Sequence, residues 1–148
     1  MTTRPFGEMA MPAASKTLGW KLVSIDAKKG EIELGFDGKA EFANPAGIVQ
    51  GGMVAAMIDD AMASIVIAHY GMKKMPSTID LHVHYLRPVR VGPVTVKAKI
   101  TEKGRSTVFV EAELFEARGK RAAKATSACA LIDMDLNQSS TIKEGDGT

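Results

Sequence analysis

The 148-residue chain contains one cysteine, few aromatic residues and almost no net charge. Cys129 has no second cysteine for an internal disulfide, and its apolar neighbours predict a buried thiol without a catalytic or metal-binding role. A formal net charge of +2 is too small to indicate a nucleic-acid partner. The first residues hold no apolar stretch of signal-peptide length, so we expect a cytoplasmic protein.

Long apolar stretches are also scarce, and the longest covers residues 53–68. It falls short of the ~20 apolar residues that span a bilayer, and Asp59, Asp60 and His69 interrupt or end it. A helix with apolar residues on all sides belongs in the core of a protein. We therefore expect a buried helix here and no membrane segment.

The rest of the chain has mainly the pattern of β-strands. Apolar and polar residues alternate in several segments, with Gly and Lys residues between them, as in antiparallel strands joined by turns. The expected strands are 20–25, 31–36, 79–86, 94–101, 108–115 and a last one that ends near Leu131 and Ile132. Together with the one long helix, they predict an α+β fold in which an antiparallel sheet wraps around a central helix.

Length and composition favour a single domain without internal repeats. We place this domain at residues 18–136. An N-terminal extension at residues 1–17 precedes it, and a polar C-terminal tail at residues 137–148 follows it.

The most informative segment is the one that leads into the helix. Residues 44–52 are Asn-Pro-Ala-Gly-Ile-Val-Gln-Gly-Gly, which predicts a loop that ends at a helix N-terminus. Asp59 and Asp60 then interrupt the apolar helix, although aspartate is rarely buried without a partner. Catalysis would explain one of these acids, and Asp60 is the better candidate for a structural role.

Residues 18–133 resemble the hot-dog-fold acyl-CoA thioesterases, specifically the phenylacetate-pathway type within the 4-hydroxybenzoyl-CoA thioesterase superfamily. The motif of those families is an Asn, a Gly three residues later, a His-Gly-Gly at the helix start, and an acid eight residues past the first Gly of that pair. The matching positions in this chain hold Asn44, Gly47, Gln50, Gly51, Gly52 and Asp59. The family also has a hydroxyl residue that opens the strand after the helix, which corresponds to Ser77 or Thr78.

Gln50 departs from the motif, because much of the family has His at this position. A glutamine amide can donate a hydrogen bond to an acyl oxygen, but it cannot take up or release a proton near neutral pH. A proton-transfer role at residue 50 is therefore excluded. Some related hot-dog thioesterases place a Gln near the thioester carbonyl, so the change is compatible with activity.

The resemblance implies hydrolysis of an acyl-CoA thioester. This reaction builds negative charge on the carbonyl oxygen, which the free N–H groups and positive dipole end of a helix N-terminus can stabilise. We expect the Gly51 N–H to bind this oxygen, with Gly47 and Gly52 in the substrate-binding set. Asp59 would act as a general base on water or as a nucleophile. Ser77 or Thr78 would hold the water or steady Asp59.

The spacing of these groups predicts a site shared between subunits. Asp59 lies eight residues beyond Gly51, which on a helix is about 12 Å, too far for both to act on one carbonyl carbon. If both act on the same thioester, they must come from different copies of the chain. The family resemblance independently implies a homodimer with shared sites, often paired further into a tetramer.

The expected partner is an acyl-CoA, and coenzyme A is then part of the substrate rather than a separate cofactor. Basic residues near the strand turns, Arg87 and Arg105 among them, could bind its phosphates. Arg105 is the best candidate, because the family often has a basic turn at this position. An aryl and a medium-chain acyl group both fit the sequence, and so does an acyl carrier protein in place of CoA.

Hot-dog folds also serve as dehydratases and as non-catalytic acyl-CoA sensors. A dehydratase needs a His that works with an acid, but His69, His82 and His84 lie outside the loop and the helix start. A sensor would lack the acid or carry a DNA-binding appendage. Asp80 shares a predicted strand face with His82 and His84 at a spacing that can bind zinc or nickel. Because the polar face of such a strand usually meets solvent, we expect no metal.

Overall fold

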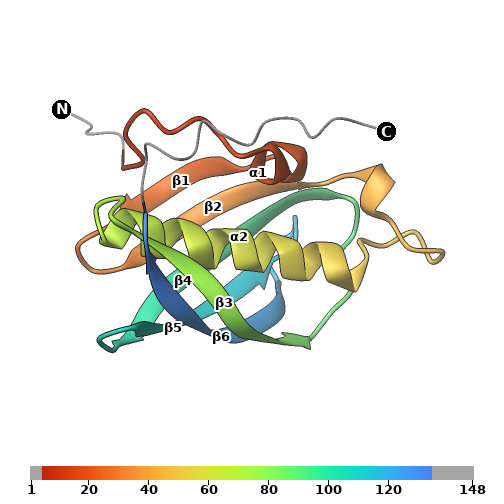
Figure 1. Cartoon of the computed structure of the whole chain (residues 1–148). Helices are drawn as coiled ribbons and strands as arrows, with labels where there is room; N and C mark the ends of the chain where they lie inside the picture. Colours follow the sequence, from red (N-terminus) through yellow and green to blue (C-terminus); the bar gives the residue numbers. More distant parts are fainter. Residues whose placement is uncertain (1–4, 135–148) are drawn as a thin grey trace, which may run out of the picture.

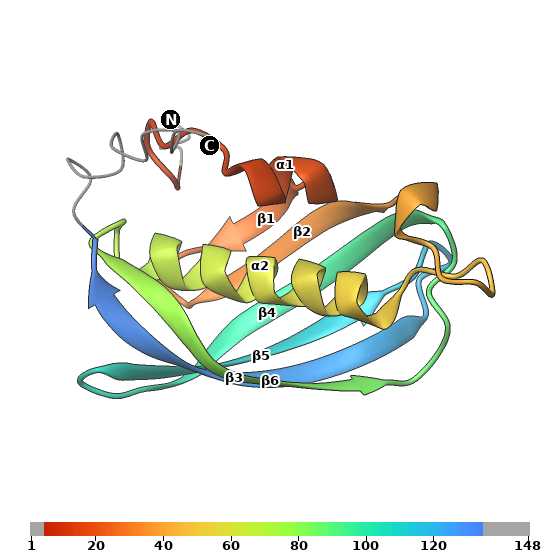
Figure 2. The same cartoon turned by 45° about the vertical axis from the view of Figure 1, so that its right-hand side comes forward.

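Six antiparallel strands form one sheet that curves around a single long helix, α2 (Gly51–His69), as Figures 1 and 2 show. The computed structural model describes residues 5–134. The other elements are α1 (Ala13–Leu18), β1 (Lys21–Asp26), β2 (Glu31–Gly38), η1 (Ala40–Phe42), β3 (Lys74–Tyr85), β4 (Gly92–Lys103), β5 (Thr107–Phe115) and β6 (Arg121–Asp133). The sheet order is β1-β2-β4-β5-β6-β3, so β1 and β3 form its edges. This is the α+β arrangement that the sequence predicts.

Helix α2 fills the inner side of the sheet and supplies the centre of the core. Its buried residues are Val54, Met57, Ile58, Ala61, Met62, Ser64, Ile65, Val66 and Ala68. By length and composition α2 could cross a membrane, but 50% of its most apolar 18-residue segment is buried inside the fold. We therefore interpret α2 as the core helix that the sequence predicts.

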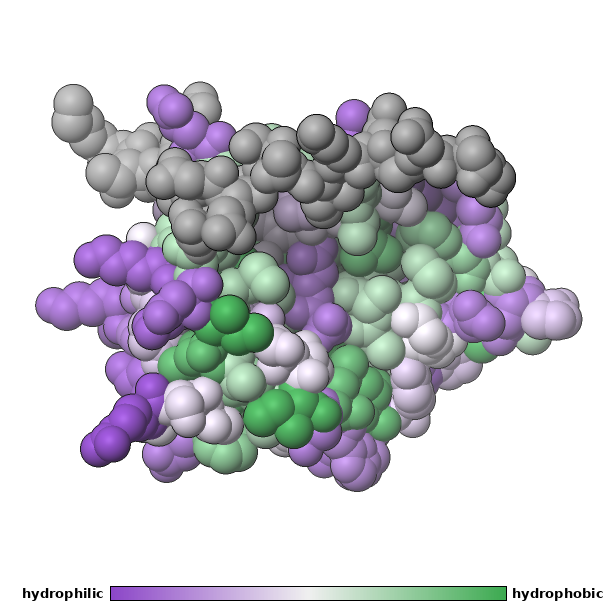
Figure 3. Space-filling view, viewed as in Figure 1, coloured by the Kyte–Doolittle hydropathy of each residue, from purple (hydrophilic) through white to green (hydrophobic). Residues whose placement is uncertain are grey.

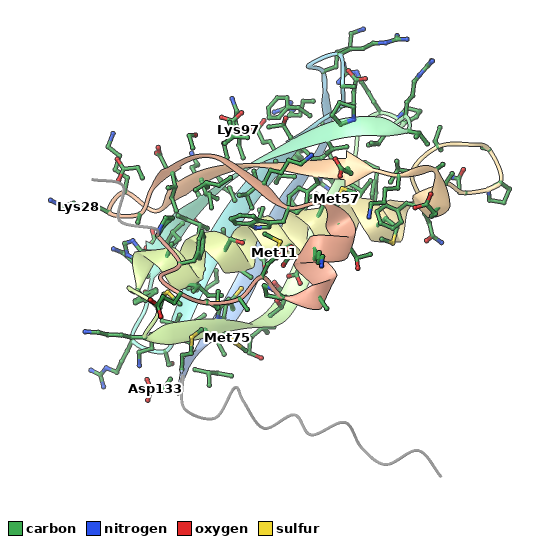
Figure 4. All side chains as sticks on the ribbon, turned by 90° about the horizontal axis from the view of Figure 1, so that it is seen from above. Met11, Lys28, Met57, Met75, Lys97 and Asp133 are labelled. Carbon is green, nitrogen blue, oxygen red and sulfur yellow. The ribbon has the colours of Figure 1, made fainter. Side chains whose placement is uncertain are left out.

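The two faces of the sheet differ in composition. In β4, Val94, Val96 and Ala98 are buried against the core, and Lys97 lies between them in sequence on the opposite face. In Figure 4, the Met57 side chain lies inside the fold, whereas Lys97 points away from it. The alternation predicted for this strand is confirmed.

Charged residues of the outer face form two rows that run across neighbouring strands. In each row, residues that pair directly across the strands alternate between Glu and Lys. The first row is Glu33, Lys97, Glu113 and Lys124, and the second row is Glu31, Lys99 and Glu111. The Lys99 and Glu111 side chains form an ion pair of 3.1 Å within the second row. Opposite charges that face each other across strands stabilise a sheet modestly.

Strand β3 differs from the sequence prediction in two ways. It begins at Lys74 rather than near Ile79 and includes Pro76, which an edge strand tolerates. A β-bulge after Thr78 then leaves Ile79 61% exposed. Ile79 therefore does not share the inner face with Leu81, although simple alternation predicts that it would.

Helix α1 is not anticipated by the sequence analysis. It ends at Gly19, whose φ of 77° is the left-handed conformation common at helix ends. The Ser15 hydroxyl donates a hydrogen bond to Asp60 Oδ1 at 3.1 Å, and Trp20 Nε1 donates to Ser64 Oγ at 3.1 Å. These contacts tie the N-terminal segment to α2.

The domain limits stay a prediction. Helix α1 spans the boundary that we place between residues 17 and 18, and the polar tail at residues 137–148 lies outside the described residues. Cys129 is buried in β6, as expected, and this burial raises the pKa of its thiol.

Candidate active site

Backbone hydrogen bonds to two other segments fix the loop before α2. The Gln50 N–H donates to the Phe42 carbonyl, and the Val49 N–H donates to the Val89 carbonyl, each at 2.8 Å. Ile48 also forms an isolated β-bridge with Arg90. The loop that follows β3 therefore lies beside the loop that leads into α2, and together they set the position of the helix start.

Asn44 organises this loop from within. Its Oδ1 accepts hydrogen bonds from the Ala46 N–H at 3.0 Å and the Ile48 N–H at 3.3 Å, as in an Asx turn. Gly47 has a φ of 78°, which favours glycine. Hydrogen bonds within the loop thus engage the Asn44 Oδ1 atom, and the NH₂ group of Asn44 is the part of the side chain left to contact a substrate. A role at the thioester stays a prediction for both residues.

The first turn of α2 presents N–H groups that have no acceptor among the described residues. Within residues 5–134, neither the Gly51 nor the Gly52 N–H donates a hydrogen bond, and the N-cap residue Gln50 makes no side-chain cap. The first N–H groups of a helix have no partner inside the helix and carry its positive dipole end. The helix start can therefore donate two hydrogen bonds to an oxygen that carries negative charge.

Tyr85, the last residue of β3, contacts this turn. Its hydroxyl donates to the Gly51 carbonyl at 2.7 Å, and a Cβ at position 51 would lie 3.3 Å from the Tyr85 ring. Close packing of the ring on the backbone therefore favours glycine at this position. The sequence analysis did not single out Tyr85. The alternation that places it on the same face as Leu81 and Val83 was the one available signal.

Asp59 lies in the middle of α2 and faces β3. The Thr78 hydroxyl donates to Asp59 Oδ1 at 3.0 Å. Ser77 is exposed, and adjacent strand residues point to opposite faces. Of the two hydroxyl candidates, the structure brings Thr78 to Asp59 and directs Ser77 away.

Asp60 has different surroundings from its neighbour. Its Oδ1 accepts the hydrogen bond from Ser15, and its Oδ2 is buried without a hydrogen-bond partner among the described residues. Burial raises the pKa of the Asp60 carboxyl, the hydrogen bond from Ser15 offsets part of the rise, and the negative charge of Asp59 adds to it. The contact with α1 fits the structural role expected for Asp60.

A single chain holds two halves of the expected site. Gly51 and Asp59 belong to one unbroken helix, so about 12 Å separates them along its axis. A hollow of 860 Å³ lies elsewhere, on the outer face of the sheet among the charged rows, and none of the predicted site residues lines it. Within one chain, Gly51 and Asp59 are therefore too far apart to act on the same carbonyl carbon.

The two basic residues expected to bind CoA lie toward opposite ends of α2. Arg87 belongs to the loop beside the helix start, where its Nη1 donates to the Arg121 carbonyl at 2.6 Å. Arg105 lies in the β4–β5 turn, two residues beyond Lys103. The Lys103 Nζ lies 3.2 Å from Nε2 of His69, the last residue of α2. Within one chain, Arg87 is therefore the member of the pair on the Gly51 side.

The imidazoles of His82 and His84 face each other on the outer side of β3, with their Nε2 atoms 3.1 Å apart. Asp80 does not join them, because its Oδ1 accepts the Ala128 N–H at 2.8 Å beside the bulge. In residues 5–134, no group of three or more His, Cys, Asp or Glu side chains could hold a metal ion. The two imidazoles lie on the face opposite to Asp59.

Comparison with known sequences gives one family and clear relatives. The family described as the thioesterase superfamily matches residues 46–123, a span that contains Gln50, Gly51, Asp59 and Thr78. A predicted esterase from Saccharolobus solfataricus is 30% identical over 119 residues, which are 79% of this chain and 81% of the relative.

Solved structures with the same fold include a phenylacetic acid degradation-related protein from Ralstonia eutropha JMP134. It is 36% identical with a TM-score of 0.80, and the match covers 85% of this chain and 95% of that chain. A Streptococcus mutans UA159 protein bound to acetyl CoA is 19% identical with a TM-score of 0.69, covering 77% of this chain and 89% of that chain. At that identity the similarity establishes the fold alone.

Proposed function

Because the chain belongs to the thioesterase superfamily, we propose that it hydrolyses an aryl or medium-chain acyl-CoA to the free acid and CoA. The resemblance found in the sequence and the hot-dog fold are both confirmed, and the protein is a thioester hydrolase. The observation that carries the finer proposal is the helix α2 itself. At its start are two N–H donors without an acceptor in residues 5–134, and in its middle is Asp59, which accepts a hydrogen bond from Thr78.

The helix start is proposed to bind the thioester carbonyl oxygen. The N–H groups of Gly51 and Gly52 donate hydrogen bonds to this oxygen as it gains negative charge during the attack on the carbonyl carbon. The positive end of the helix dipole adds to this stabilisation. The amides of Asn44 and Gln50 lie on the same loop and are proposed to orient the acyl group.

Asp59 is proposed to act on the carbonyl carbon. As a general base, its carboxylate takes a proton from water while the water oxygen bonds to the carbonyl carbon. The C–S bond then breaks, and the CoA sulfur leaves and takes up a proton. As a nucleophile, Asp59 itself attacks the carbon, displaces the CoA thiolate and forms an anhydride that water hydrolyses. In both routes Thr78 keeps the carboxylate in position.

Two subunits are proposed to share each site, with Gly51 of one chain facing Asp59 of the partner subunit. The ~12 Å between these groups within one helix supports this arrangement. The edge strand β3 supports it too, because it exposes Met75 and Ile79 beside an open edge that a second copy can cover. In Figure 3, apolar residues gather on the face that α2 and β3 present. We further propose that two such dimers form a tetramer.

The proposed carrier of the acyl group is coenzyme A, with an acyl carrier protein as the alternative. Arg87 stands beside the helix start, where a guanidinium can bind a phosphate group. The acetyl CoA bound to the Streptococcus mutans protein of the same fold supports this carrier. The reaction needs no resident cofactor, and we propose that it takes place in the cytoplasm.

Thiol release from benzoyl-CoA and hexanoyl-CoA tests the proposal. We expect the wild type to release thiol and Asp59→Asn to lower kcat by roughly 10²-fold or more, because the amide cannot act as a base. Asp60→Asn is the matched control, since it makes the same change one residue away on the side that faces α1. We expect it to keep wild-type turnover.

Three results would contradict the proposal. Equal turnover by Asp59→Asn and the wild type would exclude Asp59 from the chemistry. Tight acyl-CoA binding without thiol release would favour the sensor function. Hydration of a 2-enoyl-CoA without thiol release would favour the dehydratase.

Mixed dimers test the shared site directly. Gly51→Pro removes one donor, Asp59→Asn removes the base, and each variant alone should be nearly inactive. After subunit exchange, about half of the dimers carry one chain of each kind, and each of these holds one intact site. Activity should then recover to about a quarter of the wild-type value. No recovery after confirmed exchange would place both groups in the same chain.

A further inference from the structure

The start of α2 is weak by sequence. Glycine has one of the lowest helix propensities, and two glycines occupy the first turn. Gln50 makes no side-chain cap among the described residues, and the N–H groups of Val49 and Gln50 tie only the loop before the helix to other segments. Among the described residues, Tyr85 is the one whose side chain bonds to the first turn of α2. Tyr85 therefore holds a part of the chain that has little rigidity of its own.

We propose that Tyr85 is a positioning residue that holds the Gly51–Gly52 peptide in the orientation that the thioester oxygen requires. The Tyr85 hydroxyl donates to the Gly51 carbonyl at 2.7 Å, and this carbonyl belongs to the same planar peptide unit as the Gly52 N–H. Fixing the oxygen therefore fixes the direction of the N–H. A hydrogen bond to the carbonyl also polarises the N–H and makes it a better donor. This inference rests on the proposed thioester hydrolysis.

The Tyr85 ring adds a second constraint. It packs on Gly51 so closely that a Cβ would lie 3.3 Å from it, yet the residue as a whole remains 53% exposed. One part of the ring thus contacts the Gly51 backbone, and the rest remains exposed to solvent near the Gly51 and Gly52 N–H groups. Pairing with Ala123 of β6 fixes the Tyr85 backbone within the sheet. The rigid sheet thereby positions the helix start through one side chain.

Tyr85→Phe tests the hydroxyl while it keeps the ring on Gly51. We expect kcat to fall about tenfold, which is about 1.4 kcal/mol of transition-state stabilisation, with KM unchanged within twofold. The exposed position of Tyr85 predicts little change in Tm. Tyr70→Phe is the matched control, because Tyr70 is the other tyrosine of the chain and follows the opposite end of α2. We expect it to keep wild-type kcat.

A second measurement does not depend on catalysis. Within the helix the Ala55 N–H donates to the Gly51 carbonyl, so its amide hydrogen exchange reports the opening of the first turn. In Tyr85→Phe we expect this exchange to become several-fold faster and the Gly52 amide resonance to shift. The Tyr70 amide, which bonds to the Val66 carbonyl at the far end, should exchange as before.

The two readouts distinguish this inference from the proposed function. If the wild type hydrolyses thioesters and Tyr85→Phe has the same kcat, the role of Tyr85 is wrong and the thioesterase proposal stands. If the wild type hydrolyses no thioester, the proposed function fails. In that case, unchanged exchange at Ala55 in Tyr85→Phe would also overturn the positioning role.

Discussion

The two ends of α2 differ in whether their backbone groups have hydrogen-bond partners. At the C-terminal end, the N–H groups of Gly71 and Met72 bond back to carbonyls of the last turn, and His69 Nδ1 donates to a carbonyl of the β1–β2 turn at 2.7 Å. At the N-terminal end, the N–H groups of Gly51 and Gly52 have no acceptor in the described part of the chain. One helix is thus closed at one end and open at the other.

Under the proposed function, the closed end of the helix contributes stability and the open end contributes chemistry. The closed end uses two residues with left-handed backbone, Gly71 and Met72, to satisfy its carbonyls. An open end gives up the stability of a cap, typically ~1 kcal/mol. In the proposed function, the uncapped N–H groups of Gly51 and Gly52 are the ones that bind the ligand. The predictions below test this contrast, beginning with the largest expected effect.

Gly51→Pro, which changes the open end of α2, should abolish most of the thioesterase activity. Proline fits the first position of a helix, and the φ of −57° and ψ of 140° at Gln50 suit a residue before proline. The change removes the Gly51 N–H, so we expect kcat to fall about 10²–10³-fold with the helix retained by circular dichroism. Gly51→Ala keeps the N–H and brings a similar Cβ contact with Tyr85. Equal losses in the two variants would argue against the donor role.

Thr78→Val should have a smaller effect on the same chemistry. It removes the hydroxyl that bonds to Asp59 and leaves a side chain of similar shape, so we expect kcat to fall about tenfold. Ser77→Ala is the control, because Ser77 points to the opposite face. If Ser77→Ala lowered kcat as much as Thr78→Val, the assignment of Thr78 would be wrong.

His69→Ala should affect the closed end in a different way. Loss of the hydrogen bond to the Ala27 carbonyl should lower the free energy of unfolding by ~1 kcal/mol, measured by urea denaturation. We expect kcat to stay at the wild-type value, because His69 lies at the end away from Gly51. If His69→Ala lowered kcat without lowering the free energy of unfolding, the closed end would affect chemistry rather than stability, and the contrast between the two ends would be wrong.

Asp60→Asn should produce the smallest effect, a gain in stability of roughly 0.5 kcal/mol at pH 7. Because burial raises the pKa of Asp60, the folded state favours its protonated form. The stability associated with this proton is present at low pH and is lost as pH rises through the raised pKa. The gain in Tm from Asp60→Asn should therefore be larger at pH 7 than at pH 4. If Asp60→Asn lowered the free energy of unfolding at pH 7, the predicted direction of the effect would be wrong.

Local pattern was enough to predict most of the fold. The alternation in β4 and β5 and the continuous apolar stretch of α2 each follow from one periodicity. The prediction missed residues 74–78 of the strand because Lys74 and Pro76 resemble a turn, whereas the pairing of this segment with β6 is a tertiary contact. It misplaced Ile79 because one bulge shifts the alternation of the strand.

The candidate site was predictable only in part. The glycine-rich loop before the apolar stretch predicted the helix start at Gly51, which is confirmed. The family resemblance assigned roles to Asn44 and Asp59, and these roles stay predictions. The choice between Ser77 and Thr78 needed the strand register, and the contact of Tyr85 with Gly51 joins residues 34 positions apart. Contacts at that separation leave no periodic signal in a single sequence.

The charged rows on the outer face of the sheet also influence how a substrate approaches the protein. Each lysine in these rows pairs with at least one glutamate, so their fields largely cancel within about one Debye length, ~8 Å at physiological ionic strength. A polyanion such as CoA is then neither drawn to this face nor repelled by it. Arg87 and Arg90 lie in the loop beside the open helix end. Diffusional capture should therefore begin at that end and weaken as salt is added.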